Sequence, residues 1–493
     1  MLTRRQFFQR GAASTAAIVS GAARWQRSGD DGIVVNDIHS QLNQSRVNRV
    51  VQVASVEDVA RTIAAAREEG RAISIAGGRH AMGGQQFGAN TILLDTTGLN
   101  RVLAFDRERG HLEVEAGIEW PELVSTLTRT QKGQPRSWGI VQKQTGADRL
   151  TIGGALAANA HGRGLRYKPI IQDVEALSLV DAAGTVRRCS RRENPELFRM
   201  VIGGYGLFGV VTSVTLRLAR RQKLERVVQV LAADDLIPAF ERRIAQGFLY
   251  GDFQYSTDAA SGNLLRKGVF SCYRPVEDSR PMPERQKELA ADDWGRLLYL
   301  GHVDKQRAFD MYANYYLSTS GQLYWSDLHQ MSVYMDDYHA ALDRRLGAAD
   351  PATEMITEIY VPRAALAKFM DDTRRDIIEN RTDVVYGTIR LIERDDESLL
   401  AWAREPWACV IFNIHAVHTR EGLEQTRAAF RRLIGHAIRY NGSYFLTYHR
   451  WATRAQVEAC HPRFADFLRL KRRSDPDERF QSDWYRHYRA MFA

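Results

Sequence analysis

The stretch "SIAGGRHAMGGQQF", residues 74–87, constrains the fold more than any other part of the chain. It follows a segment with helical periodicity, "SVEDVARTIAAAREEG", and a short alternating strand pattern, "RAISIA". The predicted order is therefore helix, strand, glycine turn. Backbone N–H groups exposed by the glycines at 77, 78, 83 and 84 are suited to bind an anion such as a pyrophosphate.

A second glycine cluster, "GYGLFG" at Gly204, Gly206 and Gly209, matches the GxGxxG fingerprint of dinucleotide-binding folds. That fingerprint needs a strand before it and a helix after it, so that the helix N-terminus meets the pyrophosphate. Here the order is reversed, because "NPELFRMVIGG" has a helical pattern and "VVTSVTLRL" alternates as a strand does. We therefore reject a Rossmann fold and expect a sharp turn from a helix into a strand.

The amino-acid composition narrows the classes of protein to which the chain can belong. The chain has 493 residues, 44% of them hydrophobic, which is enough for two or three globular domains of α+β type. Its net charge of +9 comes mainly from arginine pairs without interleaved aromatic residues, so we expect a solvated basic surface and no nucleic-acid partner. The four cysteines lack metal-ligand spacing, so neither a disulfide framework nor a metal site is predicted.

Residues 1–25 include "TRRQFFQRGAASTAAIVSGAA", in which Arg4 and Arg5 precede a weakly apolar, Ala-rich run. This pattern predicts a twin-arginine signal peptide and a periplasmic or secreted protein; a frayed amphipathic helix is the alternative. The apolar run is shorter than the ~20 residues that a bilayer crossing needs, so no stable membrane anchor is expected. Twin-arginine export moves folded proteins, which suits a chain that must bind its cofactor first.

Three motifs in sequence order resemble the vanillyl-alcohol oxidase (p-cresol methylhydroxylase, PCMH) superfamily of FAD-dependent oxidoreductases. "GGRHAMGGQ" is similar to the segment of cytokinin dehydrogenases whose histidine bonds covalently to the flavin, with Ala81 in place of the usual serine. "LTIGGALAANAHGRG", residues 150–164, resembles the TxGG...HGxG segment of sugar-lactone oxidases. "ELFRMVIGGYGLFGVVTSVTLRL" resembles the LF...GGxGxFGIIT segment of the family. The resemblance covers residues 45–220.

The resemblance implies an α+β protein with a two-subdomain PCMH-type FAD-binding domain at residues 35–222. A substrate (cap) domain with an antiparallel sheet covered by helices would occupy 223–440, and a C-terminal segment, 441–493, would return to the FAD domain. In the cap, strand patterns such as "EMITEIYVP" and "WACVIFNIHAVH" alternate with helical ones. This alternation predicts a sheet covered by helices on one side.

The implied cofactor is FAD, bound covalently through His80, whose ring nitrogen would attack the activated methyl group of the flavin ring. The alternative is a hydrogen-bonded turn histidine beside a non-covalent FAD. No cysteine precedes Cys189, so a second covalent bond is not expected. The resemblance implies FAD contacts at Gly77, Gly78, Arg79, His80, Ala81, Gly83, Gly84, Gln85, Thr151, Gly153, Gly154, Ala157, His161, Gly162 and Val210.

Two later stretches resemble aldonolactone and alditol oxidases. "YGTIRLIERDDESLL" resembles their substrate-binding strand, with Arg390 and Asp395 at matching places and Thr388 where relatives often have glutamate. Arg390 is the predicted substrate-orienting residue, since a cationic fork suits a carboxylate or a developing alkoxide; an ion pair with Glu393 or Asp395 is the alternative.

The C-terminal "YHRWATRAQVEACHPRFADFLRLKRRSDPDERF" resembles the ending of the same oxidases, with one extra residue between His449 and Trp451. This segment is expected to bring Tyr448 and His449 over the flavin. Flavin chemistry on an alcohol needs a base for the hydroxyl proton. His415, Tyr448 and His449 are the candidates for that base, and each has a structural role as its alternative.

The expected function is that of an FAD-linked oxidase or dehydrogenase that oxidises a CH–OH group of a sugar, lactone, polyol or hydroxy acid. Oxygen, a quinone or a cytochrome would accept the electrons. Amine oxidation of the cytokinin-dehydrogenase kind is an alternative, although Gly146 stands at the position of the catalytic aspartate and Asp148 lies two residues away. A non-catalytic exported protein that binds flavin or an anion is the other alternative.

The export hypothesis is tested by replacing Arg4 and Arg5 with lysine. We expect the double variant to stay in the cytoplasm, because the twin arginines are the part of the signal that the export machinery reads. Cell fractionation measures the outcome. An unchanged periplasmic yield would contradict the hypothesis.

Overall fold

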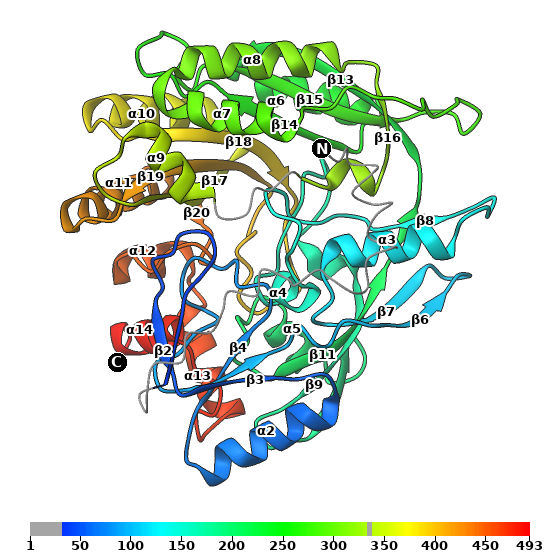
Figure 1. The fold of residues 1–493 in the computed structure, drawn as a ribbon, viewed down its shortest axis with the longest axis vertical. Helices are drawn as coiled ribbons and strands as arrows, with labels where there is room; N and C mark the ends of the chain where they lie inside the picture. Colours follow the sequence, from blue (N-terminus) through cyan, green and yellow to red (C-terminus); the bar gives the residue numbers. More distant parts are fainter. Residues whose placement is uncertain (1–31, 333–337) are drawn as a thin grey trace.

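The computed structural model describes residues 32–332 and 338–493, so the predicted signal peptide at 1–25 lies outside the described residues. Figure 1 shows a lower region built from the first half of the chain and an upper region dominated by one large sheet. The C-terminal helices pack beside the lower region. Helix and strand are mixed throughout, as expected for an α+β protein.

The lower region begins with a hairpin of β1 (Ile33–Val35) and β2 (Ser45–Val47). A parallel sheet follows, in the order β3 (Arg49–Gln52), β5 (Ile92–Asp95), β4 (Ile73–Ala76). The predicted first helix is α2 (Val56–Glu68), whose N-cap Ser55 accepts a hydrogen bond from the Asp58 amide. The glycine turn starts directly after β4, as the sequence predicted.

A second, antiparallel sheet completes the lower region. Its order is β10 (Val186–Ser190), β9 (Val174–Val180), β11 (Val210–Arg217), β7 (His111–Glu115), β6 (Val102–Asp106). The helices around it are α3 (Trp120–Thr130), α4 (Ile152–Ala157) and α5 (Pro195–Val201). A short pair, β8 (Trp138–Gly139) with β12 (Ala219–Arg220), lies where the chain leaves for the upper region.

The upper region is an eight-stranded antiparallel sheet. Its order is β16 (Leu323–Trp325), β13 (Lys223–Ala232), β15 (Lys267–Pro275), β14 (Tyr250–Tyr255), β18 (Val384–Ile392), β19 (Trp407–Val417), β17 (Ala352–Pro362), β20 (Ser443–Tyr444). The long central strands are nearly continuous apolar runs, which is typical of a sheet covered on both faces.

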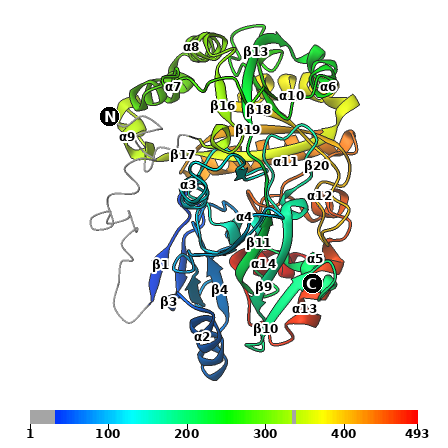
Figure 2. The same ribbon diagram turned by 90° about the vertical axis from the view of Figure 1, so that its right-hand side faces the viewer.

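Helices cover both faces of this sheet, whereas the sequence predicted one covered side (Figure 2). One layer is α6 (Leu236–Ala245), α10 (Leu366–Glu379) and α11 (Arg420–Arg439). The other is α7 (Ala291–Val303), α8 (Lys305–Ser318) and α9 (Tyr338–Leu346). Neighbouring residues of β15 separate the layers, because Phe270 packs on Phe240 of α6 and Val269 packs on Ala313 of α8.

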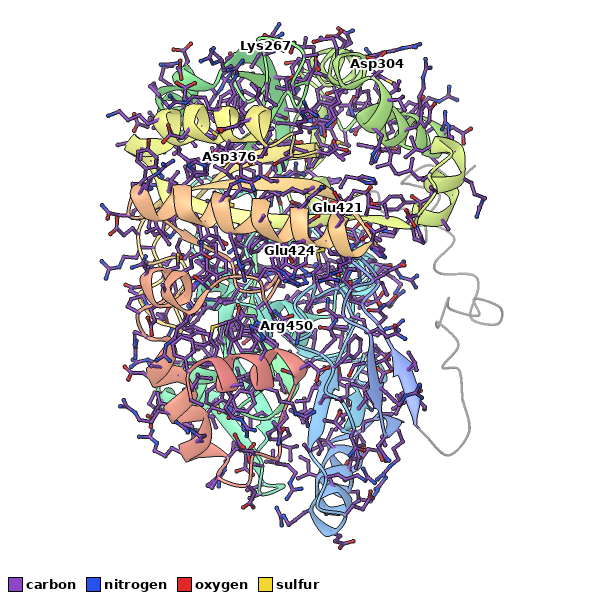
Figure 3. All side chains as sticks on the ribbon, turned by 90° about the vertical axis from the view of Figure 1, so that its left-hand side faces the viewer. Lys267, Asp304, Asp376, Glu421, Glu424 and Arg450 are labelled. Carbon is purple, nitrogen blue, oxygen red and sulfur yellow. The ribbon has the colours of Figure 1, made fainter. Side chains whose placement is uncertain are left out.

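Within the first layer, α10 and α11 run side by side (Figure 3). Asp376 on α10 accepts hydrogen bonds from Arg432 and His436 on α11 at 3.0 and 3.1 Å. These polar contacts fix the two helices against each other. In the part of the chain that the structure describes, no helix has the length and apolar character needed to cross a membrane.

The C-terminal segment contains α12 (Arg454–Cys460), α13 (Phe464–Ser474) and α14 (Asp483–Met491). It adds an edge to the parallel sheet, since the Ile73 amide donates to the Arg479 carbonyl at 2.7 Å and Gln481 donates back to Ile73 at 2.9 Å. Gln85, in the glycine-rich stretch, donates to the carbonyls of Leu446 and Thr447. The end of the chain therefore holds the glycine turn in place.

Candidate active site

A cavity of about 620 Å³ lies between the glycine turns of the lower region and the inner face of the eight-stranded sheet. Three segments line its lower side: 75–86, 144–163 and 201–211. Residues of β14, β17, β18 and β19 line the upper side, together with α7, α8 and the stretch 445–448. The three glycine motifs thus meet at one wall, although they are far apart in the sequence.

The first motif packs tightly on the start of α4. A Cβ atom on Gly77 would stand 2.2 Å from Oγ1 of Thr151, and one on Gly78 would stand 2.5 Å from the Arg149 carbonyl oxygen. No larger residue fits at either position, and Arg79 adopts a left-handed φ of 57° to continue the turn. Gly77, Gly78 and Arg79 all line the cavity.

His80 lines the cavity between two polar groups. Its Nε2 is 3.1 Å from the Arg149 carbonyl oxygen, and its Nδ1 is 2.8 Å from Nε2 of His39. Burial lowers the pKa of His80 well below its usual value, and burial lowers the pKa of His39 to about 4. Since the carbonyl only accepts, His80 Nε2 carries the proton and His39 donates to the lone pair of His80 Nδ1. The unprotonated ring nitrogen of His80 is therefore Nδ1.

The second motif presents small residues to the cavity. Thr151 is the N-cap of α4, and its side chain accepts from the Gly154 amide at 3.2 Å. The predicted contacts of this motif that line the cavity are Thr151, Gly153, Gly154, Ala157 and His161. Gly162 does not, because it packs against the backbone of Lys143, where a Cβ atom would stand 2.7 Å from the carbonyl oxygen.

Three other predicted FAD contacts lie outside the cavity wall. Val210 is fully buried in the core beside β4, while its neighbours Gly209 and Val211 face the cavity. Successive residues of a strand point to opposite faces, so the predicted position was off by one residue. Gly83 and Gly84 belong to the turn but do not line the cavity, whereas Ala81 and Gln85 do.

Glu358 on β17 lies at the centre of the polar wall, and the sequence analysis missed it. Its side chain is 2% exposed and contacts His161 Nε2 at 2.5 Å. It also accepts hydrogen bonds from the hydroxyls of Tyr360 at 2.5 Å and Tyr448 at 3.2 Å. Burial alone would raise the pKa of this carboxyl, but His161, Tyr360 and Arg390 together lower it to about 2.

A signal for Glu358 was present in "EMITEIYVP", where Glu354 and Glu358 recur on one face of an apolar strand. Polar residues that alternate along a strand usually indicate a solvated face, so this pattern alone does not predict a buried site. The structure instead places β17 between β19 and β20, with this face toward the cavity.

Arg390 on β18 faces the cavity with 8% of its surface exposed, and the described residues place no carboxylate in an ion pair with it. The alternative partners are engaged elsewhere. Glu393 pairs with Arg363 at 2.8 Å, and Asp395 accepts hydrogen bonds from Asn159 and Ser398. Arg390 therefore offers a buried positive charge to whatever occupies the cavity.

The three predicted base candidates are placed differently. Tyr448 lines the cavity, and burial together with the nearby Glu358 charge raises its pKa well above the usual value. His449 does not line the cavity, because its ring lies against Trp451 at a centroid distance of 3.4 Å. His415 lies behind Glu354, outside the cavity wall. Only the Tyr448 hydroxyl is positioned to meet a substrate.

The cavity fits a large flat cofactor held mainly by backbone. Gly146 and Gly206 line it at positive φ, and an added Cβ atom would meet nothing within 4 Å at Gly146 and only Ile75 at Gly206. Several buried polar atoms of the wall have no hydrogen-bond partner among the described residues. They are Gln144 Nε2, Thr145 Oγ1, Thr388 Oγ1, Arg390 Nε, Asn413 Oδ1 and Thr447 Oγ1.

Comparison with known proteins agrees with this geometry. The model of a family described as "FAD binding domain" matches residues 47–190. L-gulonolactone oxidase of Bos taurus is 30% identical over 167 residues, which is 34% of this chain and 36% of that protein. Cytokinin dehydrogenase 4 of Oryza sativa subsp. japonica is 31% identical over 197 residues, or 38% and 36% of the two chains.

A third relative is the mitochondrial L-galactono-1,4-lactone dehydrogenase 2 of Oryza sativa subsp. japonica, 29% identical over 207 residues. That alignment covers 41% of this chain and 34% of the relative. The chain thus spans about a third of the length of each of these relatives. The similarity is shared by proteins named for two different substrate classes.

The lowered pKa of Glu358 predicts an acid-dependent loss of stability. A group whose pKa falls on folding stabilises the protein above its unfolded value, near 4.5, and that stability is lost as pH falls toward 2. Replacing Glu358 with Gln should make unfolding free energy less dependent on pH in this window, by up to ~1.4 kcal/mol per pH unit. Urea unfolding at several pH values measures the slope.

The exposed Glu405 provides the matched control, Glu405→Gln, which should keep the wild-type slope. If Glu358→Gln also unfolds with the wild-type pH dependence, the carboxylate is not ionised in the folded protein as its contacts require.

Proposed function

Because the chain belongs to the vanillyl-alcohol oxidase superfamily and residues 47–190 match its FAD-binding domain, we propose an FAD-dependent oxidoreductase of CH–OH groups. The substrate class is a small sugar, lactone, polyol or hydroxy acid. The observation that carries the proposal is Arg390, a buried cation that lines the same cavity as the glycine turns, near Glu358 but in no close ion pair among the described residues. FAD supplies a hydride acceptor, the N5 atom of its ring.

The chain supplies the positioning of the substrate. The planar guanidinium of Arg390 presents a donor fork that matches a carboxylate or a developing alkoxide. The Tyr448 hydroxyl donates its proton to Glu358, so its oxygen lone pairs are open to accept a hydrogen bond from a substrate hydroxyl. With Thr388 and Asn413 beside them, these groups orient the reacting carbon toward the lower wall of the cavity.

Amine oxidation of the kind named by the cytokinin dehydrogenases is the alternative, and the loop at 146–148 favours CH–OH oxidation over it. Gly146 occupies the position of their catalytic aspartate. Asp148 does not line the cavity, because it pairs with the buried Lys143 at 2.8 Å and accepts from the Ser332 amide. This loop therefore offers no carboxylate to an amine substrate.

We further propose covalent attachment of FAD through His80, and export through the twin-arginine segment with cofactor already bound. His80 would hold the flavin through its unprotonated Nδ1, which would give up its hydrogen bond with His39. The flavin methyl group would lose one C–H bond, with its proton released and its electron pair taken up by the flavin ring, and the electron acceptor would then reoxidise the ring. Oxygen, a quinone or a cytochrome would accept the electrons from the reduced flavin.

Replacing Arg390 with Lys tests the substrate role. Loss of the bidentate contact, ~1.5 to 3 kcal/mol for a hydrogen bond to a charged group, should slow flavin reduction ten- to hundredfold at low substrate. Bound flavin and its spectrum should be unchanged. Stopped-flow reduction with the best substrate from an anaerobic panel measures the rate, and the exposed Arg394→Lys is the control. Wild-type rates in Arg390→Lys would remove this residue from the site.

Replacing His80 with Ala tests the covalent bond. After acid precipitation, the wild-type pellet should stay yellow, whereas the variant should release its chromophore to the supernatant. His111→Ala, on β7 and outside the cavity wall, should behave as wild type. A colourless wild-type pellet would show that FAD is held without a covalent bond.

A further inference from the structure

Three histidines surround a second buried carboxylate, Glu354, four residues before Glu358 on β17. Glu354 is 3.3 Å from His302 Nε2 of α7 and 3.5 Å from His415 Nδ1 of β19, both measured to Oε1. Its other oxygen, Oε2, is 3.1 Å from His339 Nδ1 of α9. The side chains of Glu354 and His302 are 3% and 5% exposed. Four elements of the cap region thus converge on one point.

The charge of Glu354 needs a cationic partner. A buried carboxylate is costly unless it is paired, and the described residues place no Lys or Arg in an ion pair with it. The Tyr338 hydroxyl donates a hydrogen bond to it at 2.5 Å. Glu354 therefore lies within a shell of three histidines and one tyrosine.

The three imidazoles are not arranged to donate hydrogen bonds to Glu354. His302 Nε2, His339 Nδ1 and His415 Nδ1 are all close to the carboxylate, yet none makes a hydrogen bond of acceptable angle. The ring nitrogens therefore do not direct a proton at the nearest oxygen. Such an arrangement is typical of ligand atoms directed at a common centre between them.

The spacing fits a tetrahedral metal ion. Bonds of ~2.0 to 2.1 Å to imidazole nitrogen and carboxylate oxygen separate ligand atoms by about 3.3 Å. The distances from Oε1 of Glu354 are 3.3 Å to His302 Nε2 and 3.5 Å to His415 Nδ1. The ligand atoms of His302, Glu354 and His415 all lie within 4.8 Å of one another. Histidine with one carboxylate is a common zinc ligand set.

We propose that His302, Glu354 and His415 bind a zinc ion as a three-ligand site, with the fourth position left to water and His339 beside it on the other carboxylate oxygen. Glu354 and His339 also line the cavity, so the ion borders the chamber proposed for substrate. Glu358 follows Glu354 by four positions along the strand, a rise of about 13 Å, which makes this a separate site from Arg390 and Tyr448. The sequence predicted no metal, because ligands at 302, 354 and 415 form no short motif.

Metal content of the flavin-loaded protein tests the site. After dialysis against Zn²⁺ and then metal-free buffer, elemental analysis should find about one zinc per chain in wild type. The double variant His302→Ala/His415→Ala should retain less than a tenth of that, with its flavin content unchanged. His418→Ala is the matched control, because His418 lies near the cluster but contacts Thr353. It should bind zinc as wild type does.

Cobalt substitution in the wild-type protein keeps the test independent of variant folding. Co²⁺ in a tetrahedral nitrogen and oxygen site should give visible absorption on the long-wavelength side of the flavin bands, and added Zn²⁺ should displace it. Zinc that stays below a tenth of an equivalent in wild type, or a double variant that retains it, would overturn the proposal. Absence of the cobalt absorption would do the same.

Discussion

The buried carboxylate of Glu358 is the interaction on which the arrangement of the site depends. One oxygen contacts His161, which belongs to the second glycine motif, and the other accepts from Tyr448 in the C-terminal segment. Glu358 itself belongs to the cap sheet. Removing one partner of such a buried pair typically costs ~3 to 5 kcal/mol, so the three segments are held together where the cavity forms.

The rest of the site follows from the geometry of the two walls. On the cap side, every second residue of the central strands points inward, which brings Thr388, Arg390, Asn413 and Glu358 to one face. On the opposite side, glycines expose backbone and leave room for a flat group. A polar sheet face therefore opposes a backbone cradle, and under the proposed function the sheet would orient the substrate between them.

Local patterns were enough to predict much of the lower region. The 3.6-residue period of the first helix and the reversed order around "GYGLFG" both match the structure. The structure brings the glycine turn, Thr151 and His161 to one cavity, as the resemblance implied. These features depend on residues close together in sequence, where spacing carries the information.

The residues that the structure places differently from the sequence predictions depend on contacts between distant parts of the chain. Val210 faces the core because of its register in β11, and His449 packs on Trp451 away from the cavity. Glu358 and Glu354 face the cavity because β17 pairs with β19 and β20 in this register. The second helical layer of the cap comes from residues 291–346, for which no helix was predicted. The periodicity of hydrophobic residues along a single segment reveals none of these features.

Anaerobic titration of the purified protein tests whether its bound flavin oxidises CH–OH compounds. We expect a yellow protein whose flavin is reduced by at least one CH–OH compound from a panel of sugars, lactones, polyols and 2-hydroxy acids. One equivalent of that substrate should bleach one equivalent of flavin. Flavin that stays oxidised with every CH–OH compound and bleaches with an amine would contradict the account, as would a protein purified without flavin.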